Sequence, residues 1–276
     1  MEIKKIKELL ALGPSDDQLK LLHSDKRTTV HKLLLAYEKR KKLMQEEHNR
    51  FKSLLNYEAE YYKKGVKAIA GVDEVGRGPL AGPLVIAAVI LPEDVFIEGL
   101  NDSKKLLPSK RKKIFVEIVS KAIDIAVNIV SVSNIDKLNI YKATQEGMVQ
   151  VLNALKIRPE IALVDAMPLN LETIKTHAII HGDALSASIA AASVVAKVMR
   201  DEMMERLGSI FYNYDFAGNK GYGSKEHMRA IEEFGATEWH RRSFAPVRHK
   251  NLEPVKSFKN MIYYPLCDTY EFVSED

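Results

Sequence analysis

The chain of 276 residues is long enough for one large and one small domain, and its 46% hydrophobic and 28% charged residues are typical of a soluble globular protein. It has no run of about 18 apolar residues and no apolar signal stretch near Met1, so we expect a cytoplasmic protein without a transmembrane helix. The one cysteine, Cys267, cannot form an internal disulfide and lies far from any histidine cluster, which argues against a zinc site.

The net charge of +4 is distributed unevenly along the chain. Residues 1–66 contain 15 Lys and Arg against 10 Asp and Glu, a net of +5, whereas the remainder contains 26 against 27. A basic N-terminal segment favours a polyanionic partner. On charge alone, a solvated helical face explains the same residues equally well.

Residues 1–65 are predicted to form a helical N-terminal accessory domain. Residues 15–18 read SDDQ, which is typical of a capping box at the start of a short helix. Apolar residues then recur every seven positions, at Val30, Tyr37, Met44 and Phe51. This spacing predicts a long amphipathic helix or a helical hairpin. Gly65 ends the charge-rich stretch, so we place the domain boundary near residues 62–68.

The next segment, 66–250, has the pattern of an α/β domain. Apolar runs predict strands at 68–72, 84–91, 122–133, 161–165 and 177–181, and helices are predicted at 142–156, 184–207 and 224–234. The early strands have short connections, which favours an antiparallel meander, and helices separate the later ones, which favours parallel additions. We therefore expect a mixed five-stranded sheet with helices on both faces. The tail, 251–276, is apolar enough to dock back on this domain.

Four carboxylates lie at the ends of these predicted elements. Asp73 and Glu74 end the first strand, Asp165 ends the fourth, and Asp183 immediately precedes the long helix. Ligands of open sheets gather where strand ends meet helix starts, so all four acids are expected at one edge. Consecutive strand residues point to opposite faces, so Asp73 and Glu74 can share a ligand only if the strand bends, and the glycines and proline of 75–79 supply a bend.

Clustered carboxylates repel one another and raise one another's pKa unless a cation neutralises them. Oxygen ligands of this kind suit Mg²⁺ or Mn²⁺, and two such ions can activate a water and stabilise the leaving oxygen of a phosphodiester. Taken alone, Asp183 has the position of an ordinary helix N-cap, and Asp165 that of a polar strand end. Taken together, the four acids favour a metal-dependent phosphodiesterase.

Several motifs in the same order resemble those of the ribonuclease HII family, the type 2 ribonucleases H. Residues 71–83 read GVDEVGRGPLAGP and carry the strongest resemblance. The others are NDSKKL at 101–106, LVDA at 163–166, GD at 182–183, AASVVAK at 191–197 and GYGS at 221–224. The resemblance covers about residues 66–250. Type 3 enzymes lack the Gly-Arg-Gly stretch in this form.

The resemblance implies the ribonuclease H fold and a role for each matching residue. The acids Asp73, Glu74, Asp165 and Asp183 match the catalytic, metal-binding residues, with Mn²⁺ or Mg²⁺ as cofactor. Gly76, Arg77 and Gly78 match a loop that senses the ribose 2′-OH, and Tyr222 matches a tyrosine that packs against the ribonucleotide sugar. The side chains that match phosphate-holding positions are Asn101, Lys104 and Lys105.

The activity implied by the resemblance is endonucleolytic cleavage 5′ of a ribonucleotide, in RNA–DNA hybrids and in duplex DNA with single ribonucleotides. Two-metal-ion catalysis would leave 3′-OH and 5′-phosphate ends, in ribonucleotide excision repair and in removal of RNA from DNA. We expect a monomer that does not bind membranes. The 2′-OH distinguishes RNA from DNA, and glycine lets main-chain groups approach it closely. Lysines contact phosphates without reading sequence.

Other interpretations of the supporting residues stay open at this stage. Lys104 and Lys105 suit an ordinary solvated turn, and Tyr222 suits core packing. Three serines of the long helix suit close approach to the sheet better than a nucleophilic role: Ser186, Ser188 and Ser193. His181 suits a structural role. Three arginines that flank residues 243–246 suit either contact with DNA phosphates or capping of the last helices: Arg241, Arg242 and Arg248.

Two rival functions also fit parts of the pattern. Another nuclease of the same fold, such as a resolvase or a transposase-like enzyme, would use clustered acids without sensing a 2′-OH. A non-catalytic nucleic-acid-binding module is disfavoured, because unneutralised acids repel a phosphate backbone.

Overall fold

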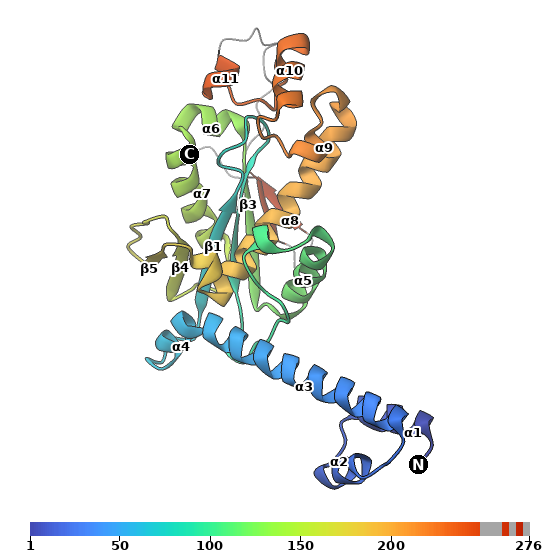
Figure 1. Ribbon diagram of the computed structural model, residues 1–276. Helices are drawn as coiled ribbons and strands as arrows, with labels where there is room; N and C mark the ends of the chain where they lie inside the picture. The colour runs from blue at the N-terminus through green and yellow to red at the C-terminus, as the bar shows by residue number, and fades with distance from the viewer. Residues whose placement is uncertain (249–260, 265–268, 273–276) are drawn as a thin grey trace. The chain divides into compact units, whose positions relative to one another are not determined.

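The computed structural model describes residues 1–248, 261–264 and 269–272, and the chain forms two compact units, Met1–Lys52 and Ser53–Asp276 (Figure 1). In the first unit, α1 (Ile3–Leu12) and α2 (Asp16–His23) pack with the start of α3 (Thr28–Leu54). Their shared core consists of Ile6, Leu10, Leu22, Val30 and Leu34.

The predicted helix signals of this unit are confirmed. Ser15 accepts a hydrogen bond from the backbone N–H of Gln18, whose side chain accepts one from the Ser15 N–H, so the capping box is complete. The seven-residue spacing corresponds to the single helix α3, and α4 (Asn56–Tyr62) follows it at the start of the second unit. Gly65 has φ of 84°, which ends the helical stretch. No helix in the described residues has both the length and the apolar character needed to cross a membrane.

The second unit is built on a sheet in the order β5-β4-β1-β2-β3-β6-β7. The strands are β1 (Ile69–Val75), β2 (Leu84–Ile90), β3 (Asp124–Val130), β4 (Ile161–Asp165), β5 (Lys175–Ile179), β6 (Met261–Tyr264) and β7 (Thr269–Phe272). As predicted, β1, β2 and β3 form an antiparallel meander, while β4 and β5 add in parallel beside β1. Beyond the five predicted strands, the tail adds β6 and β7 at the β3 edge, which confirms that the tail docks on this domain.

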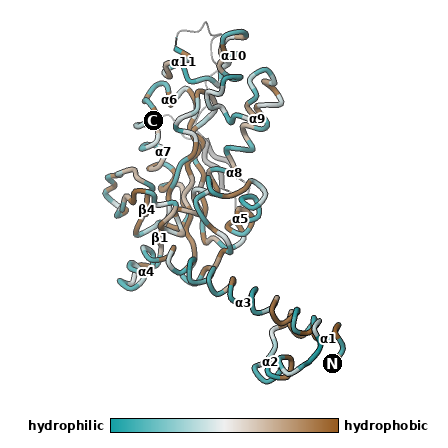
Figure 2. Tube along the Cα trace, viewed as in Figure 1, coloured by the Kyte–Doolittle hydropathy of each residue, from teal (hydrophilic) through white to brown (hydrophobic). Residues whose placement is uncertain are grey.

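Helices cover both faces of the sheet, as expected. On one face α7 (Ile140–Ala154) packs over β1, β2 and β3, with α6 (Val132–Leu138) beside it; on the other face lie α8 (Ala187–Ile210) and α5 (Pro108–Lys121). The strands are mainly hydrophobic, whereas most of α3 is hydrophilic (Figure 2). Small residues let α8 lie close to β1: a Cβ on Gly71 would come within 2.0 Å of the Ser188 carbonyl carbon.

Some element boundaries differ from the sequence-based expectations. Residues 132–133 belong to α6 and not to the third strand, because Ser131 caps a helix by accepting a hydrogen bond from the Asn134 N–H. The helix α5 was not predicted. The predicted long helix begins at Ala187, after a short 3₁₀ turn, η2 (Gly182–Ala184).

The chain beyond α8 forms a small lobe with its own apolar core. It contains η3 (Tyr212–Tyr214), α9 (Phe216–Asn219), α10 (Lys225–Phe234) and α11 (Ala245–Arg248). Buried residues of this lobe pack against Leu80 and Ala81, which follow β1, so the lobe holds the loop that leaves the first strand.

Candidate active site

The ends of β1 and β4 bring two of the predicted acids to one edge of the sheet. Their parallel pairing stops at Val72 opposite Val164, one residue before Asp73 and Asp165. The antiparallel pairing of β1 with β2 continues through Val75, so the predicted bend lies after both acids, at Gly76, and not between them. Successive side chains of a regularly paired strand point to opposite faces of the sheet, so Asp73 points toward α8 and Glu74 leaves the strand on the opposite face.

Asp73 is buried, Glu74 beside it is partly buried, and the charge of Glu74 acts on Asp73. Asp73 is only 4% exposed, and burial, followed by the charges of Glu74 and Asp165, raises its pKa well above the usual range. Burial raises the pKa of Glu74 to about 7, although Arg77, whose Nη1 lies 3.4 Å from Glu74 Oε1, opposes the shift. Glu74 Oε2 is buried and has no hydrogen-bond partner among the described residues.

The turn η2, which contains Asp183, is hydrogen-bonded to Asp165 at the end of β4. Asp165 Oδ1 accepts a hydrogen bond of 2.7 Å from the Gly182 N–H, which fixes the strand end against this turn. Burial raises the pKa of Asp183, and the charges of Asp102 and Asp165 add to that shift. Asp183 is not a helix cap, because Ser186 caps α8 by accepting from the Ile189 N–H. The charge of Asp165 therefore acts on each of the other three predicted acids.

A second loop brings positive charge to this group. The 3₁₀ turn η1 (Ser103–Lys105) is capped by Asp102, whose side chain accepts a hydrogen bond from the Lys104 N–H. Burial lowers the pKa of Lys104, but Asp73, Asp183 and other carboxylates outweigh this, so that its pKa is raised overall. The exposed Lys105 lies 3.9 Å from Asp102, and Asn101 Oδ1 accepts from the Asp102 N–H.

The acids do not form a preformed metal-coordination site. Across residues 1–248 no three His, Cys, Asp or Glu side chains are grouped closely enough to hold an ion. The chemistry of the donors nevertheless fits Mg²⁺ or Mn²⁺. Asp73 and Asp183 are buried, Glu74 and Asp165 are partly buried, Asp165 repels the other three carboxylates, and Glu74 Oε2 is an unused acceptor. A divalent cation would remove that electrostatic cost.

A buried arginine holds the Gly-Arg-Gly loop, residues 76–78, through hydrogen bonds to the loop backbone. Arg241 is fully buried, and its guanidinium donates to the carbonyls of Gly76 at 2.6 Å, Arg77 at 2.9 Å and Gly82 at 2.8 Å. Neither interpretation of Arg241, as a phosphate ligand or as a helix cap, is right. Sequence spacing could not reveal this role, because more than 150 residues separate the donor from its acceptors.

A second buried arginine joins this loop to the next one. Arg200 of α8 donates to the carbonyls of Pro83, Ala81 and Lys220 at 3.0, 3.1 and 2.9 Å. A Cβ on Gly76, which has φ of 102°, would lie 2.3 Å from Arg200 Nε. Glycine at this position is therefore required both by the backbone conformation and by the close approach of the arginine.

Tyr222 lies at the surface beside the Gly-Arg-Gly loop. Its side chain is 50% exposed, so it is not a core residue. An added Cβ on Gly78 would lie 3.5 Å from Tyr222 Cε1, and the Leu80 N–H donates to the Gly221 carbonyl at 2.8 Å. The structure thus brings together the two loops that the sequence resemblance singles out.

Two of the predicted serines, Ser186 and Ser193, make structural hydrogen bonds. Ser193 hydrogen-bonds Asp73 and lies 2.8 Å from Ser103 Oγ, which connects β1, α8 and η1. Ser186 caps its helix and donates to Glu58, a buried acid that sequence reasoning did not single out. His181, with φ of 58°, forms the left-handed turn before Gly182.

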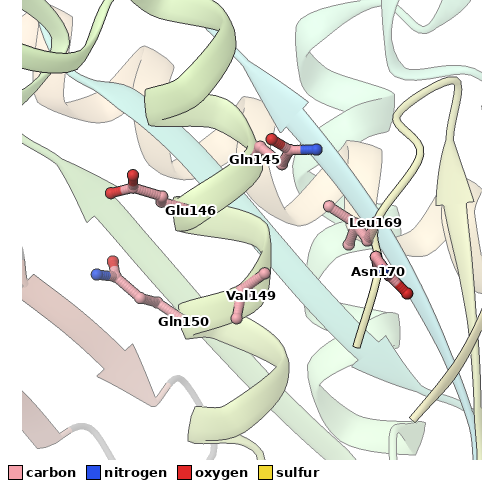
Figure 3. Close-up of a pocket in the computed structure, with 6 residues that line it drawn as sticks. All are labelled: Gln145, Glu146, Val149, Gln150, Leu169 and Asn170. Carbon is pink, nitrogen blue, oxygen red and sulfur yellow. The ribbon is translucent and has the colours of Figure 1, made fainter. Parts of the chain in front are cut away.

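A pocket of about 470 Å³ lies elsewhere, on the α7 side of the sheet. In Figure 3, four side chains of α7 line one side of it and two residues that follow β4 line the other. The lining residues are Gln145, Glu146, Val149, Gln150, Leu169 and Asn170. None of the predicted site residues is among them, so the candidate active site is the edge formed by the acids and the two loops.

Comparison with known proteins identifies the family. Residues 70–247 match the family model of ribonuclease HII, and residues 2–62 match that of the ribonuclease HII N-terminal domain. The chain belongs to the ribonuclease HII family. Ribonuclease HII of Lactobacillus johnsonii is 49% identical over 249 residues, which are 90% of this chain and 98% of that protein. Ribonuclease HII of Bacillus thuringiensis is 50% identical over 237 residues, 86% of this chain and 92% of that protein.

Solved structures confirm the ribonuclease H fold of this chain. Ribonuclease H2 from Pyrococcus horikoshii aligns with a TM-score of 0.58 and 29% identity, over 66% of this chain and 95% of that one. The ribonuclease HII in the PCNA complex from Archaeoglobus fulgidus aligns with a TM-score of 0.52 and 29% identity, over 60% and 87%. The protein is therefore a metal-dependent endoribonuclease of the ribonuclease H class, a hydrolase that acts on RNA–DNA hybrids.

Proposed function

We propose that this enzyme cuts the phosphodiester 5′ of a ribonucleotide, both in RNA–DNA hybrids and at single ribonucleotides embedded in duplex DNA. The products would carry 3′-OH and 5′-phosphate ends, and the biological role would be ribonucleotide excision repair as well as removal of RNA from DNA. The observation that carries the proposal is the proximity of two features: the acids that interact through Asp165 and, directly after the first two of them, a glycine loop that lies beside Tyr222.

The acids Asp73, Glu74, Asp165 and Asp183 are the proposed ligands of two divalent ions, Mn²⁺ or Mg²⁺. When bound, such ions supply an activated water and neutralise charge on the leaving oxygen. The support for this assignment is electrostatic: buried, repelling carboxylates are stable only with a counter-charge, and Lys104 provides one charge for several acids.

The chain's own groups would position the substrate. With the Gly76 and Arg77 carbonyls held by Arg241, we expect the amide N–H groups of this loop to contact the ribose 2′-OH. The Tyr222 ring would pack on the sugar and reject a misplaced one by shape. Asn101, Lys104 and Lys105 would hold phosphates, so cleavage should not depend on base identity.

The test is a paired cleavage assay on two duplexes of identical sequence, one all-DNA and one with a single ribonucleotide, each with Mg²⁺, with Mn²⁺ and with a chelator. We expect metal-dependent cutting of the second duplex alone, 5′ of the ribonucleotide. Equal cutting of both duplexes would instead indicate a nuclease that does not sense the 2′-OH. Metal-independent binding without product would indicate a binding module.

Replacing Tyr222 by Ala should lower the rate of cutting at a DNA–ribonucleotide junction on the order of tenfold, the size of one lost aromatic contact to a nucleotide. The overall affinity for the duplex should change less, because phosphate contacts dominate it. The measurements are single-turnover cleavage and equilibrium binding. Tyr212→Ala, the same change at a side chain that is 79% exposed, is the matched control. Equal losses of rate and affinity would count against a sensing role.

The basic N-terminal unit is proposed to assist substrate binding. Residues 1–52 contain 13 Lys and Arg against 8 Asp and Glu, so this unit alone carries the net +5. Deletion should stop at Lys52, because Glu58 accepts from the Ser186 hydroxyl at 2.6 Å and the Ser188 N–H at 2.9 Å at the start of α8. We expect weaker duplex binding and a shallower dependence of affinity on salt. Unchanged affinity at every salt concentration would favour a partner-protein contact instead.

A further inference from the structure

Two buried histidines form a hydrogen-bonded pair beneath the Tyr222 loop. His227 of α10 and His240, in the loop before α11, are both 0% exposed, and their Nε2 atoms lie 3.0 Å apart. The other ring nitrogen of His240, Nδ1, accepts a hydrogen bond of 2.9 Å from the Thr237 N–H. The other ring nitrogen of His227, Nδ1, lies 2.8 Å from the backbone carbonyl oxygen of Tyr222.

The end groups fix the proton on each ring. A backbone N–H can only donate, so His240 Nδ1 must carry a lone pair and His240 Nε2 must carry the hydrogen. His240 Nε2–H therefore donates to His227 Nε2, which leaves the hydrogen of His227 on Nδ1. The Tyr222 carbonyl oxygen can only accept, so it receives the hydrogen bond that His227 Nδ1–H donates. Every bond in the series thus runs in one direction, from Thr237 to Tyr222.

The surroundings keep both rings neutral, as this pattern requires. The rings of Tyr214 and Phe216 pack edge-on or tilted against the pair. The charge of Asp215 favours a protonated His227, but burial outweighs it. Burial lowers the pKa of His227, and burial together with His227 lowers the pKa of His240 to about 3.

The series ends on a residue whose side chain is free at the surface. The Tyr222 carbonyl accepts from His227 Nδ1 and from the Ser224 N–H, while the half-exposed ring lies beside Gly78. A bond to the backbone of Tyr222 restrains where its ring sits without covering the ring.

We propose that His240 and His227 are positioning residues that hold Tyr222 at the distance from the Gly-Arg-Gly loop at which its ring can engage a ribonucleotide sugar. The inference rests on the proposed function of Tyr222 and adds two residues that never touch the substrate. A histidine pair that served only as core packing would contribute to stability and not to junction cutting.

Two matched variants separate these roles. His227→Asn keeps a side-chain N–H near the position of Nδ1, facing the Tyr222 carbonyl, whereas His227→Gln places its amide near the position of Nε2, facing His240. Both bury an uncharged amide in place of the ring. On duplex DNA with one ribonucleotide, His227→Gln should cut about fivefold more slowly than His227→Asn in single-turnover assays, the effect of one neutral hydrogen bond. Their melting temperatures and duplex affinities should be equal.

The decisive comparison repeats the pair in a Tyr222→Ala background. There the difference between Asn and Gln should vanish, because no ring remains to be positioned. Equal rates for the two single variants, or a difference that persists without the ring, would overturn the inference. If the His227 variants do not fold, His240→Gln and His240→Asn replace them, with Gln, which keeps the donor toward His227, expected to cut faster. Failure of the wild-type protein to prefer the ribonucleotide duplex would count against the proposed function and not against this pair.

Discussion

The Asp165→Asn variant is expected to lose metal-dependent cleavage by at least about a thousandfold while it keeps its fold. An amide is a poorer ligand for Mg²⁺ or Mn²⁺ than a carboxylate, and it removes the charge that those ions need. The local structure should survive, because the Asn Oδ1 can still accept from the Gly182 N–H, as Asp165 Oδ1 does at 2.7 Å. Single-turnover cleavage of the ribonucleotide duplex in Mg²⁺ and in Mn²⁺ measures the loss.

Thermal unfolding gives this prediction a second readout. The pKa values of Asp73, Glu74 and Asp183 are raised in the folded state, so ionising these groups at neutral pH destabilises the metal-free protein. Removing the charge of Asp165 relieves part of that repulsion. The metal-free variant should therefore melt at or slightly above the wild-type temperature, and added metal should stabilise the wild type more.

Asp94→Asn is the matched control for both measurements, since it makes the same change at an exposed loop residue. It should behave as the wild type in cleavage and in melting. Full activity of Asp165→Asn would remove Asp165 from the proposed set of ligands, and a large loss of stability would make its inactivity uninformative about catalysis.

The sequence was most informative where one segment carries its own signal. The apolar runs of β1, β2 and β4 are each recognisable alone, and the acids at their ends follow from strand boundaries. The helix α5 was missed because lysines and arginines interrupt its apolar positions, of which Ile114 and Ile118 are buried. The strands of the tail could be expected to dock, but the edge on which they pair is set by β3, more than 130 residues earlier.

The parts of the site that could not be foreseen depend on contacts between distant segments. Asp102 acts on Asp183 across the η1 and η2 turns, and nothing near either residue predicts their proximity. Arginines near a possible substrate are usually assigned to phosphates, yet Arg241 is fully buried and binds carbonyls. Which polar residues support a functional loop from inside is determined by the tertiary structure and not by local spacing.

The second large effect is expected for Arg241→Lys. Burial, followed by the charge of Arg200, lowers the pKa of Arg241 to about 9, so the guanidinium is still charged at neutral pH. Three backbone carbonyls accept hydrogen bonds from it. A lysine has one nitrogen in place of the planar fork and cannot reach the carbonyls of Gly76, Arg77 and Gly82 together. With buried carbonyls left unsatisfied, we expect a loss of about 3 kcal/mol in the free energy of unfolding.

For a protein of this size that loss corresponds to a melting temperature lower by about 6–12 °C. Below the transition, cutting at the ribonucleotide should fall by about 10- to 100-fold, because the Gly76–Gly78 backbone is no longer held in one geometry. Arg248→Lys, at an exposed side chain that donates to the Ser243 carbonyl, makes the same substitution and should change stability by less than about 0.5 kcal/mol. If both variants melted alike and cut at the wild-type rate, the guanidinium would not be what fixes the loop, and the backbone bonds of Leu80 and Gly82 to neighbouring segments would suffice.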